Sequence, residues 1–293
     1  MLYFPGCTLK TTAINFETSA KAVAKRMGIE LEEMPKWNCC GTVFSLASDD
    51  LMHHIAPIRI LIRAQELGHK RLVTLCAMCY NTLKMANEEI RQDKEKMEKI
   101  NAFMDDEPDY EGSVEVLHFL ELLRDIPQVD IKNKVERSLE GLKVMPYYGC
   151  LLVRPEYAAL DDNEYPKLME DMLRSIGAEP VYVPYNVECC GAYQTVNRKE
   201  MVAQRTYKII SAAKKRGAEA IVLSCPLCDF NLDNRQKEAA ALFKDLEEMP
   251  VFYFTQLMAL AFGCRREEIG LDGHYIDPKP LLRKKGLLEE VRG

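Results

Sequence analysis

The sequence lacks three features that would each assign it to a broad class of protein. It has no block of basic residues and its formal net charge is -6, so we expect no nucleic-acid partner. Its longest apolar runs, such as LMALAFG (257–263), are too short to span a bilayer. Met1 leads directly into LYFPGC, without the basic segment and cleavage site of a secretory signal. We therefore expect a cytoplasmic protein with no membrane span.

The composition is that of a folded protein, with 47% hydrophobic and 29% charged residues among 293. This length leaves room for two domains. In a reducing cytoplasm structural disulfides are rare, and neighbouring cysteines bridge only with a strained backbone. The 11 cysteines therefore indicate metal or redox chemistry.

Ten of the cysteines form two copies of one pattern, a single cysteine followed by an adjacent pair and then by a C-x2-C. The first thiol set is Cys7, Cys39, Cys40, Cys76 and Cys79, and the second thiol set is Cys150, Cys189, Cys190, Cys225 and Cys228. A structural zinc site and an ordinary iron–sulfur cluster each use four ligands. Each set therefore holds something unusual or leaves one thiol free to react.

The residues around the cysteines are repeated as well. GHKRLVTLCAMC (68–79) matches GAEAIVLSCPLC (217–228) without a gap, and VEVLHFLELL (114–123) resembles VFYFTQLMAL (251–260). The second alignment places His118 opposite Thr255. A repeat of this length is too long for a solenoid. It predicts a duplicated domain, with a first copy over 1–140 and a second over 141–293.

Each copy alternates short apolar strands with amphipathic helices. The expected strands are 2–5, 29–33, 71–75, 114–117, 143–148, 179–183, 220–224 and 250–254. The expected helices are 12–27, 43–66, 80–98, 118–125, 165–176, 198–216, 228–244 and 255–263. This alternation predicts an α/β fold, with two tandem Rossmann-like parallel sheets flanked by helices and related by a pseudo-twofold axis. Because the cysteines follow strands, each thiol set should converge at the carboxyl edge of its sheet.

The thiols allow two kinds of metal site. A C-x2-C with two further cysteines could bind zinc at one or both sites, although zinc ribbons usually pair two such knuckles. Thiolates also suit iron, so iron–sulfur clusters fit the pattern better. The C-x2-C-x2-C run of bacterial ferredoxins is absent, and we therefore expect electrons to arrive from another protein.

With these motifs the chain resembles the B subunit of heterodisulfide reductase, whose cysteine-rich CCG domain is also duplicated. The resemblance includes CYNTLKMAN (79–87), LDDNEYPK (160–167) and FYFTQLMALAFG (252–263) as well as both CCG patterns, and it covers nearly the whole chain. No ferredoxin or flavin segment is fused to the chain, which favours the stand-alone B subunit over longer relatives. Gly41 follows the first cysteine pair where methanogenic members tend to have proline, so we expect a divergent or non-methanogenic member.

The resemblance implies that each thiol set binds a noncubane [4Fe–4S] cluster. It also implies an oxidoreductase of anaerobic metabolism that splits a small-molecule or protein disulfide between the two clusters. Its partners would be an iron–sulfur protein that resembles the C subunit of that reductase and a flavoprotein that resembles its A subunit. The thiol pair and the physiological direction stay open. Two other functions remain, an electron-transfer subunit without disulfide chemistry and a zinc-organised scaffold.

Four residues outside this pattern also bear on function. Lys10 and Arg154 follow the first cysteine of each copy and are candidate contacts to an anionic substrate. Cys264 lies outside both copies, so we expect it to be a core thiol. His118 opens a predicted helix and could face the crevice, but the histidines show no ligand spacing.

Overall fold

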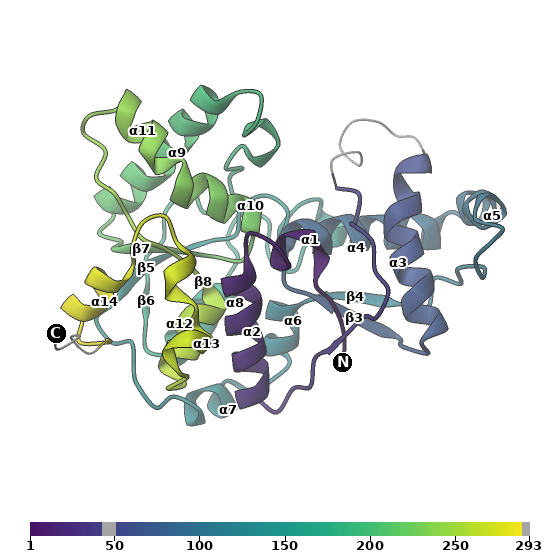
Figure 1. Cartoon of the computed structure of the whole chain (residues 1–293), viewed down its shortest axis with the longest axis horizontal. Coiled ribbons are helices and arrows are strands. Elements are labelled where there is room, and N and C mark those ends of the chain that lie inside the picture. The colour runs from purple at the N-terminus through teal and green to yellow at the C-terminus, as the bar shows by residue number, and fades with distance from the viewer. Residues whose placement is uncertain (43–50, 289–293) are drawn as a thin grey trace.

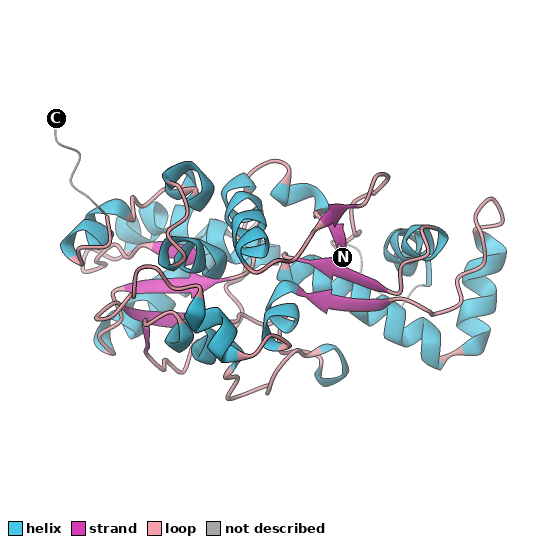
Figure 2. Cartoon of the chain, turned by 90° about the horizontal axis from the view of Figure 1, so that it is seen from below, coloured by secondary structure: helices cyan, strands magenta, loops and turns pink. Residues whose placement is uncertain are grey.

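The computed structural model describes residues 1–42 and 51–288. It contains two four-stranded sheets, each entirely parallel, with helices on both faces (Figure 2). The first sheet has the order β2-β1-β3-β4, and its strands are β1 (Leu2–Phe4), β2 (Glu32–Glu33), β3 (Arg71–Thr74) and β4 (Glu115–His118). The second has the order β6-β5-β7-β8, with β5 (Lys143–Tyr147), β6 (Glu179–Pro180), β7 (Ala220–Leu223) and β8 (Val251–Tyr253). The predicted fold class is confirmed.

All eight expected strands are present, but two of the four edge strands, β2 and β6, are much shorter than predicted. β2 and β6 each keep two residues of the five expected. Pro180 has no backbone N–H and therefore cannot donate to the ladder from the edge. Short edge strands also limit pairing with other chains.

Seven helices lie where the strand–helix alternation predicts them. They are α2 (Ile14–Arg26), α3 (Ile55–Glu66), α4 (Ala77–Gln92), α6 (Phe119–Arg124), α8 (Leu168–Ser175), α9 (Lys199–Lys215) and α12 (Phe254–Ala261). The expected helix 43–66 begins outside the described residues, and a 3-10 turn (Leu51–His54) precedes α3. The short helices α1 (Gly6–Leu9), α7 (Gln128–Asn133), α13 (Arg266–Ile269) and α14 (Lys279–Lys284) were not predicted.

Two predicted helices are interrupted. The helix expected over 80–98 ends at Asp93, whose carboxylate accepts the N–H of Lys96 and so caps a new helix, α5 (Lys94–Phe103). The helix expected over 228–244 is replaced by α10 (Pro226–Asp229), a π-helical segment (Phe230–Asn234) and α11 (Gln236–Leu242).

Helices of each half pack against the other half. α2 lies beside α12 and α13, while α6 contacts α8 (Figure 1). Within the first of these contacts, Phe16 stacks on Tyr253 with ring centroids 4.1 Å apart, and the hydroxyls of Ser19 and Thr255 are 2.7 Å apart. The two sheets therefore share one continuous hydrophobic core.

The strand register corrects one detail of the repeat. His118 pairs with Thr74, and Tyr253 pairs with Leu223, in each case two residues before the first cysteine of the C-x2-C. His118 therefore corresponds to Tyr253, and its alignment with Thr255 was wrong by two residues. A slip of two preserves the alternation of side chains between the faces of a strand, so the apolar pattern alone does not detect it.

Candidate metal centre

Each thiol set gathers at the carboxyl edge of its sheet. Cys7 follows β1, and Cys76 is the N-cap residue of α4, directly after β3. The Sγ atoms of Cys7 and Cys39 are 4.0 Å apart, and Cys40 lies close enough to Cys39 and Cys79 for both to lower its pKa. All five thiols of the first set are therefore neighbours, although they are distant in sequence.

The second thiol set repeats this arrangement. Its Cys225 is the N-cap residue of α10, directly after β7. The Sγ atoms of Cys190 and Cys228 are 3.4 Å apart, and Cys189 lies close enough to Cys150 and Cys190 for both to lower its pKa. The N–H of Gly191 donates to the Sγ of Cys189 over 3.3 Å, a type of contact that tunes the potential of thiolate-bound clusters.

The two thiol sets meet where the halves join. Cys76 and Cys225 occupy the same position in the two halves, and their thiols lie close enough for each to shift the pKa of the other. Beside them the N–H of Ala77 points to the carbonyl of Ser224, with nitrogen and oxygen 3.4 Å apart. The pair Cys76 and Cys225 joins equivalent residues and therefore marks the pseudo-twofold axis. The sequence spacing carries no signal for it.

The thiols of each set lie so close together that they can all be deprotonated only around a positive charge. Hydrogen bonds from Cys39 and Cys79 lower the pKa of Cys40, while the hydrogen bond to Cys40 raises the pKa of Cys39. In the second set, hydrogen bonds from Cys150 and Cys190 likewise lower the pKa of Cys189. Thiols packed this closely cannot all ionise unless cations compensate their charge. The donor sets thus fit multi-iron clusters.

Two glycines leave room for the cysteine sulfurs. Gly6 and Gly149 precede the first cysteine of each set, and both have a left-handed backbone, with φ of 71° and 66°. A Cβ atom on Gly6 would lie 2.8 Å from the Sγ of Cys79, and one on Gly149 would lie 3.3 Å from the Sγ of Cys228. Both the backbone conformation and the close sulfur favour glycine at these positions.

Residues of the first half help to enclose the second thiol set. A hollow lined by all five cysteines of that set is also lined by Ala77, Met78 and Tyr193. The hydroxyl of Tyr193 donates to the Sδ of Met78 over 2.9 Å, which joins the two halves across the hollow. Asn81 adds a second link, since its amide donates to the carbonyls of Leu151 and Arg154.

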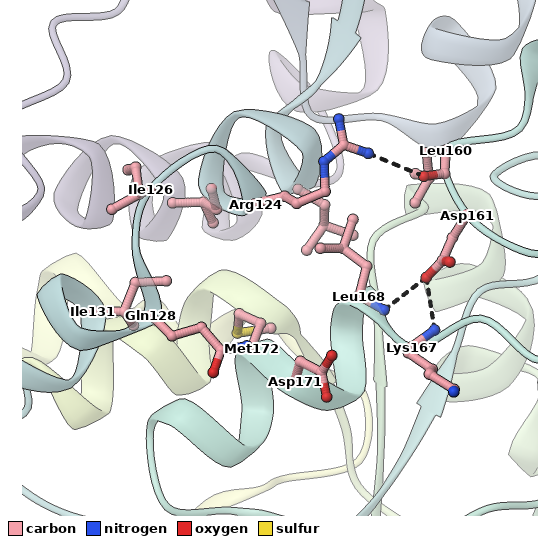
Figure 3. A pocket seen from close by; sticks show the side chains of 12 residues that line it. Arg124, Ile126, Gln128, Ile131, Leu160, Asp161, Lys167, Leu168, Asp171 and Met172 are labelled. Atoms are coloured by element: carbon pink, nitrogen blue, oxygen red, sulfur yellow. Dashed lines mark hydrogen bonds between the residues drawn. The ribbon is translucent and has the colours of Figure 1, made fainter.

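A larger cavity lies elsewhere between the halves (Figure 3). It has a volume of about 250 Å³ between α6, α7 and α8, with Leu120, Leu123, Ile131, Leu168 and Met172 among its walls. Asp161 on its rim accepts the N–H groups of Lys167 and Leu168. No cysteine is among its lining residues, so it is separate from the thiol sets.

The two predicted substrate contacts are engaged within their own halves. Lys10 forms ion pairs with Glu17 at 2.7 Å and Glu33 at 2.6 Å. Arg154 donates to the backbone carbonyls of Val187 at 2.7 Å and Asn163 at 3.3 Å. Their role in substrate binding stays a prediction, and the charge of Lys10 is already paired.

The two remaining candidates lie in the core. Burial lowers the pKa of His118 to about 4, so its ring is neutral. One ring nitrogen accepts the N–H of Leu120 and the other is 2.8 Å from the carbonyl of Leu75, which leaves none for the crevice. Cys264 is buried beyond the end of α12, as expected.

Every helix within residues 1–42 and 51–288 is too short or too polar to cross a lipid bilayer.

Comparison with known proteins supports the duplicated pattern. The family described as "CCG: Cysteine-rich domain" matches residues 1–84 and 144–233. The chain is 33% identical over 281 residues to the 8-methylmenaquinol:fumarate reductase membrane anchor subunit of Wolinella succinogenes, covering 95% of this chain and 98% of that protein. It is 26% identical over 288 residues to the B subunit of the ferredoxin/F(420)H(2)-dependent CoB-CoM heterodisulfide reductase of Methanosarcina acetivorans, covering 96% and 95%.

Two further similarities extend this picture. A heterodisulfide reductase B-subunit-like protein of Archaeoglobus profundus is 26% identical over 299 residues, covering 99% of this chain and 98% of that protein. The crystal structure of a hypothetical protein from Helicobacter pylori has a TM-score of 0.74 at 14% identity, covers 94% of this chain and supports the fold. This chain spans about half the length of that protein, with 51% covered.

Proposed function

The chain belongs to the CCG cysteine-rich domain family, with the domain present twice, and on this basis we propose that it is the catalytic subunit of a heterodisulfide-reductase-like complex. Its reaction would be the reduction of a disulfide to two thiols, with two electrons and two protons consumed for each S–S bond broken. An iron–sulfur partner protein would supply the electrons, and a flavoprotein would lie upstream of it.

The contact between Cys76 and Cys225 is the observation that carries this proposal. Each thiol set would hold one noncubane [4Fe–4S] cluster, whose contribution is the delivery of single electrons. A disulfide needs two electrons, and the two sets would both face a disulfide bound at the junction between the halves. Duplication of the domain therefore matches the electron count of the reaction.

The protein's own residues would shape the crevice. Met78 and Tyr193 join the two halves over the second thiol set and would exclude water from it. Tyr193 lies close enough to both sets to feel the charge of Cys40 and Cys225. It is thus positioned to orient a disulfide that enters between them.

A second function is favoured by one relative. The protein from W. succinogenes, at 33% identity, is named as part of a fumarate reductase and not of a disulfide reductase. The chain would then pass electrons within another oxidoreductase complex, using the same two thiol sets. A zinc-organised scaffold is the third possibility.

Metal analysis and turnover separate these functions. Anaerobically purified protein should contain about eight irons with matching sulfide, from two four-iron clusters, whereas two zincs and no iron would support the scaffold. With reduced viologen as donor, the intact protein should reduce at least one member of a series of disulfides. If viologen reduced the clusters but no disulfide was consumed, the electron-transfer function would replace the catalytic one.

Variants of the two junction cysteines test the two-site mechanism. Cys76→Ser and Cys225→Ser should each abolish disulfide turnover, while electron acceptance at the other set survives. Cys264→Ser is the matched control, because this thiol lies outside both sets. If either junction variant kept substantial turnover, one set would be a relay and the two-site mechanism would be excluded.

A further inference from the structure

Three ligand-type side chains form a buried cluster next to the second thiol set. Asp229 ends α10 directly after Cys228, Asp233 lies in the π-helical segment, and His274 comes from the loop before α14. Their side chains are 14%, 0% and 0% exposed. The His274 Nδ1 atom is 3.5 Å from Asp233 Oδ2 and 3.9 Å from Asp229 Oδ1. The three ligand atoms lie within 4.8 Å of one another.

Hydrogen bonds around Gln256 determine which nitrogen of His274 carries the proton. The Gln256 Oε1 atom accepts the N–H of Tyr253 at 2.9 Å, and its Nε2 donates to the carbonyl of Gly270 at 3.0 Å. Its oxygen therefore faces the His274 Nε2 atom, 3.0 Å away, and that nitrogen is the donor. A neutral His274 consequently turns the lone pair of Nδ1 towards the two carboxylates. This support of a ligand histidine by a hydrogen-bond acceptor is typical of metal sites.

Two of the three facing ligand atoms have no hydrogen bond of their own, while the third, Asp233 Oδ2, accepts the N–H of Tyr275 at 2.7 Å. Nδ1 of His274 and Oδ1 of Asp229 are both buried without a partner among the described residues. A direct hydrogen bond would bring nitrogen and oxygen to about 2.7–3.2 Å. Two ligands that each lie about 2.0–2.2 Å from one ion are separated by roughly 3.0–3.6 Å. The observed 3.5 and 3.9 Å are thus closer to a metal-bridged arrangement.

The first half carries a cation at the corresponding place. Counted from the C-x2-C, Tyr80 and Lys84 occupy the positions of Asp229 and Asp233. The Nζ atom of Lys84 is 2.7 Å from the Tyr80 hydroxyl and 3.5 Å from a carboxylate oxygen of Glu121. The second half has two carboxylates there instead, and their ion-pair partner within residues 1–42 and 51–288 is the histidine alone. A bound cation would supply the charge that the lysine provides in the first half.

We propose that Asp229, Asp233 and His274 bind one divalent ion of the zinc class, separate from the iron of the thiol sets. One imidazole nitrogen and two carboxylate oxygens are ligands that Zn²⁺ accepts, with water as the fourth. The ion neutralises two buried carboxylates and ties the C-terminal loop to the chain beside Cys228. It sits on a π-helical segment, a feature frequent at functional sites.

Zinc K-edge X-ray absorption and metal analysis of the anaerobic holoprotein test this site. We expect about one zinc per chain, with nitrogen and oxygen neighbours at about 2.0–2.1 Å and no sulfur shell at about 2.3 Å. A preparation that has lost zinc should return to about one zinc per chain after dialysis against Zn²⁺ and removal of loosely bound metal. His274→Gln and Asp233→Asn should each lower zinc at least tenfold without loss of iron or sulfide. Asp272→Asn, an exposed change in the same loop, is the matched control and should retain zinc.

The zinc K-edge spectrum of the unmodified protein tests the zinc site even if a variant fails to fold. Sulfur neighbours around zinc would place the ion in a thiol set and overturn the proposal. Failure of the dialysed protein to retain zinc would also overturn it, and the cluster would then be a histidine–aspartate ion pair. Iron content and disulfide turnover are measured separately, so loss of this site leaves the proposed function standing.

Discussion

Replacing Gly6 by alanine should remove iron from the first thiol set. The new Cβ atom would lie 2.8 Å from the Sγ of Cys79, whereas ordinary contact begins at 3.4 Å, so the sulfur or the backbone must move by about 0.6 Å. Ligand distances in metal sites tolerate deviations of about 0.2 Å. The displacement exceeds this tolerance, and we expect Gly6→Ala to lose about half of the protein's iron.

The same substitution elsewhere isolates the effect of the sulfur. Gly68 has a similar left-handed backbone, with φ of 74°, but an added Cβ atom would meet nothing within 4 Å. Gly68→Ala should therefore lower the free energy of unfolding by about 1–2 kcal/mol without changing iron. Gly149→Ala requires a shift of only about 0.1 Å at Cys228 and should also keep its iron.

Iron and sulfide are assayed per chain after anaerobic purification, and the free energy of unfolding is measured with denaturant. Full iron content in Gly6→Ala would refute the reasoning, because it would show that the Cys79 sulfur is not held against Gly6 as a ligand. Equal iron loss in Gly68→Ala would also refute the reasoning, because it would show that backbone strain and not the contact with sulfur removes the iron.

Three further results are expected. Cys40→Ser and Cys190→Ser should alter the spectroscopic type of the cluster, because a cubane needs only four thiolates; an unchanged electron paramagnetic resonance spectrum would contradict a fifth ligand. Burial raises the pKa of Glu170 from 4.5 to about 7, so its contribution to stability is complete below pH 4.5 and is lost by about pH 7. Glu170→Gln should remove about 3 kcal/mol of this pH dependence in denaturant unfolding between pH 4.5 and 8, and an unchanged slope would exclude this carboxyl as its source. Asn81→Ala leaves the carbonyls of Leu151 and Arg154 unpaired and should lower the free energy of unfolding by about 2–4 kcal/mol, measured in the same way.

Much of this architecture could be predicted from the sequence because its signals are local. Strands and helices follow from apolar periodicity over a few residues, and eight strands were found where it indicated them. The repeated cysteine pattern indicated the duplicated domain. The cysteines that follow strands come together because the carboxyl ends of parallel strands lie at one edge of a sheet. The order of the strands within each sheet was not predicted and comes from the structure.

The junction between the halves was decided by tertiary structure alone. The contact of Cys76 with Cys225 and the packing of α2 on α12 depend on how two complete surfaces fit together. No short stretch of sequence encodes such a fit, since each half presents the same local pattern whichever way it docks. The position of His118 was misjudged for a related reason, because a shift of two residues leaves the pattern of a strand intact.

The cluster of Asp229, Asp233 and His274 also needed the folded chain. His274 lies outside the repeated segments, 41 residues after Asp233, and its separation matches no ligand spacing. Only the return of the C-terminal loop past the end of α10 brings its ring to the two carboxylates. The sequence by itself determined which thiols belong together. Tertiary structure decided which residues surround the two thiol sets, because burial and charge compensation act between residues that meet only after folding.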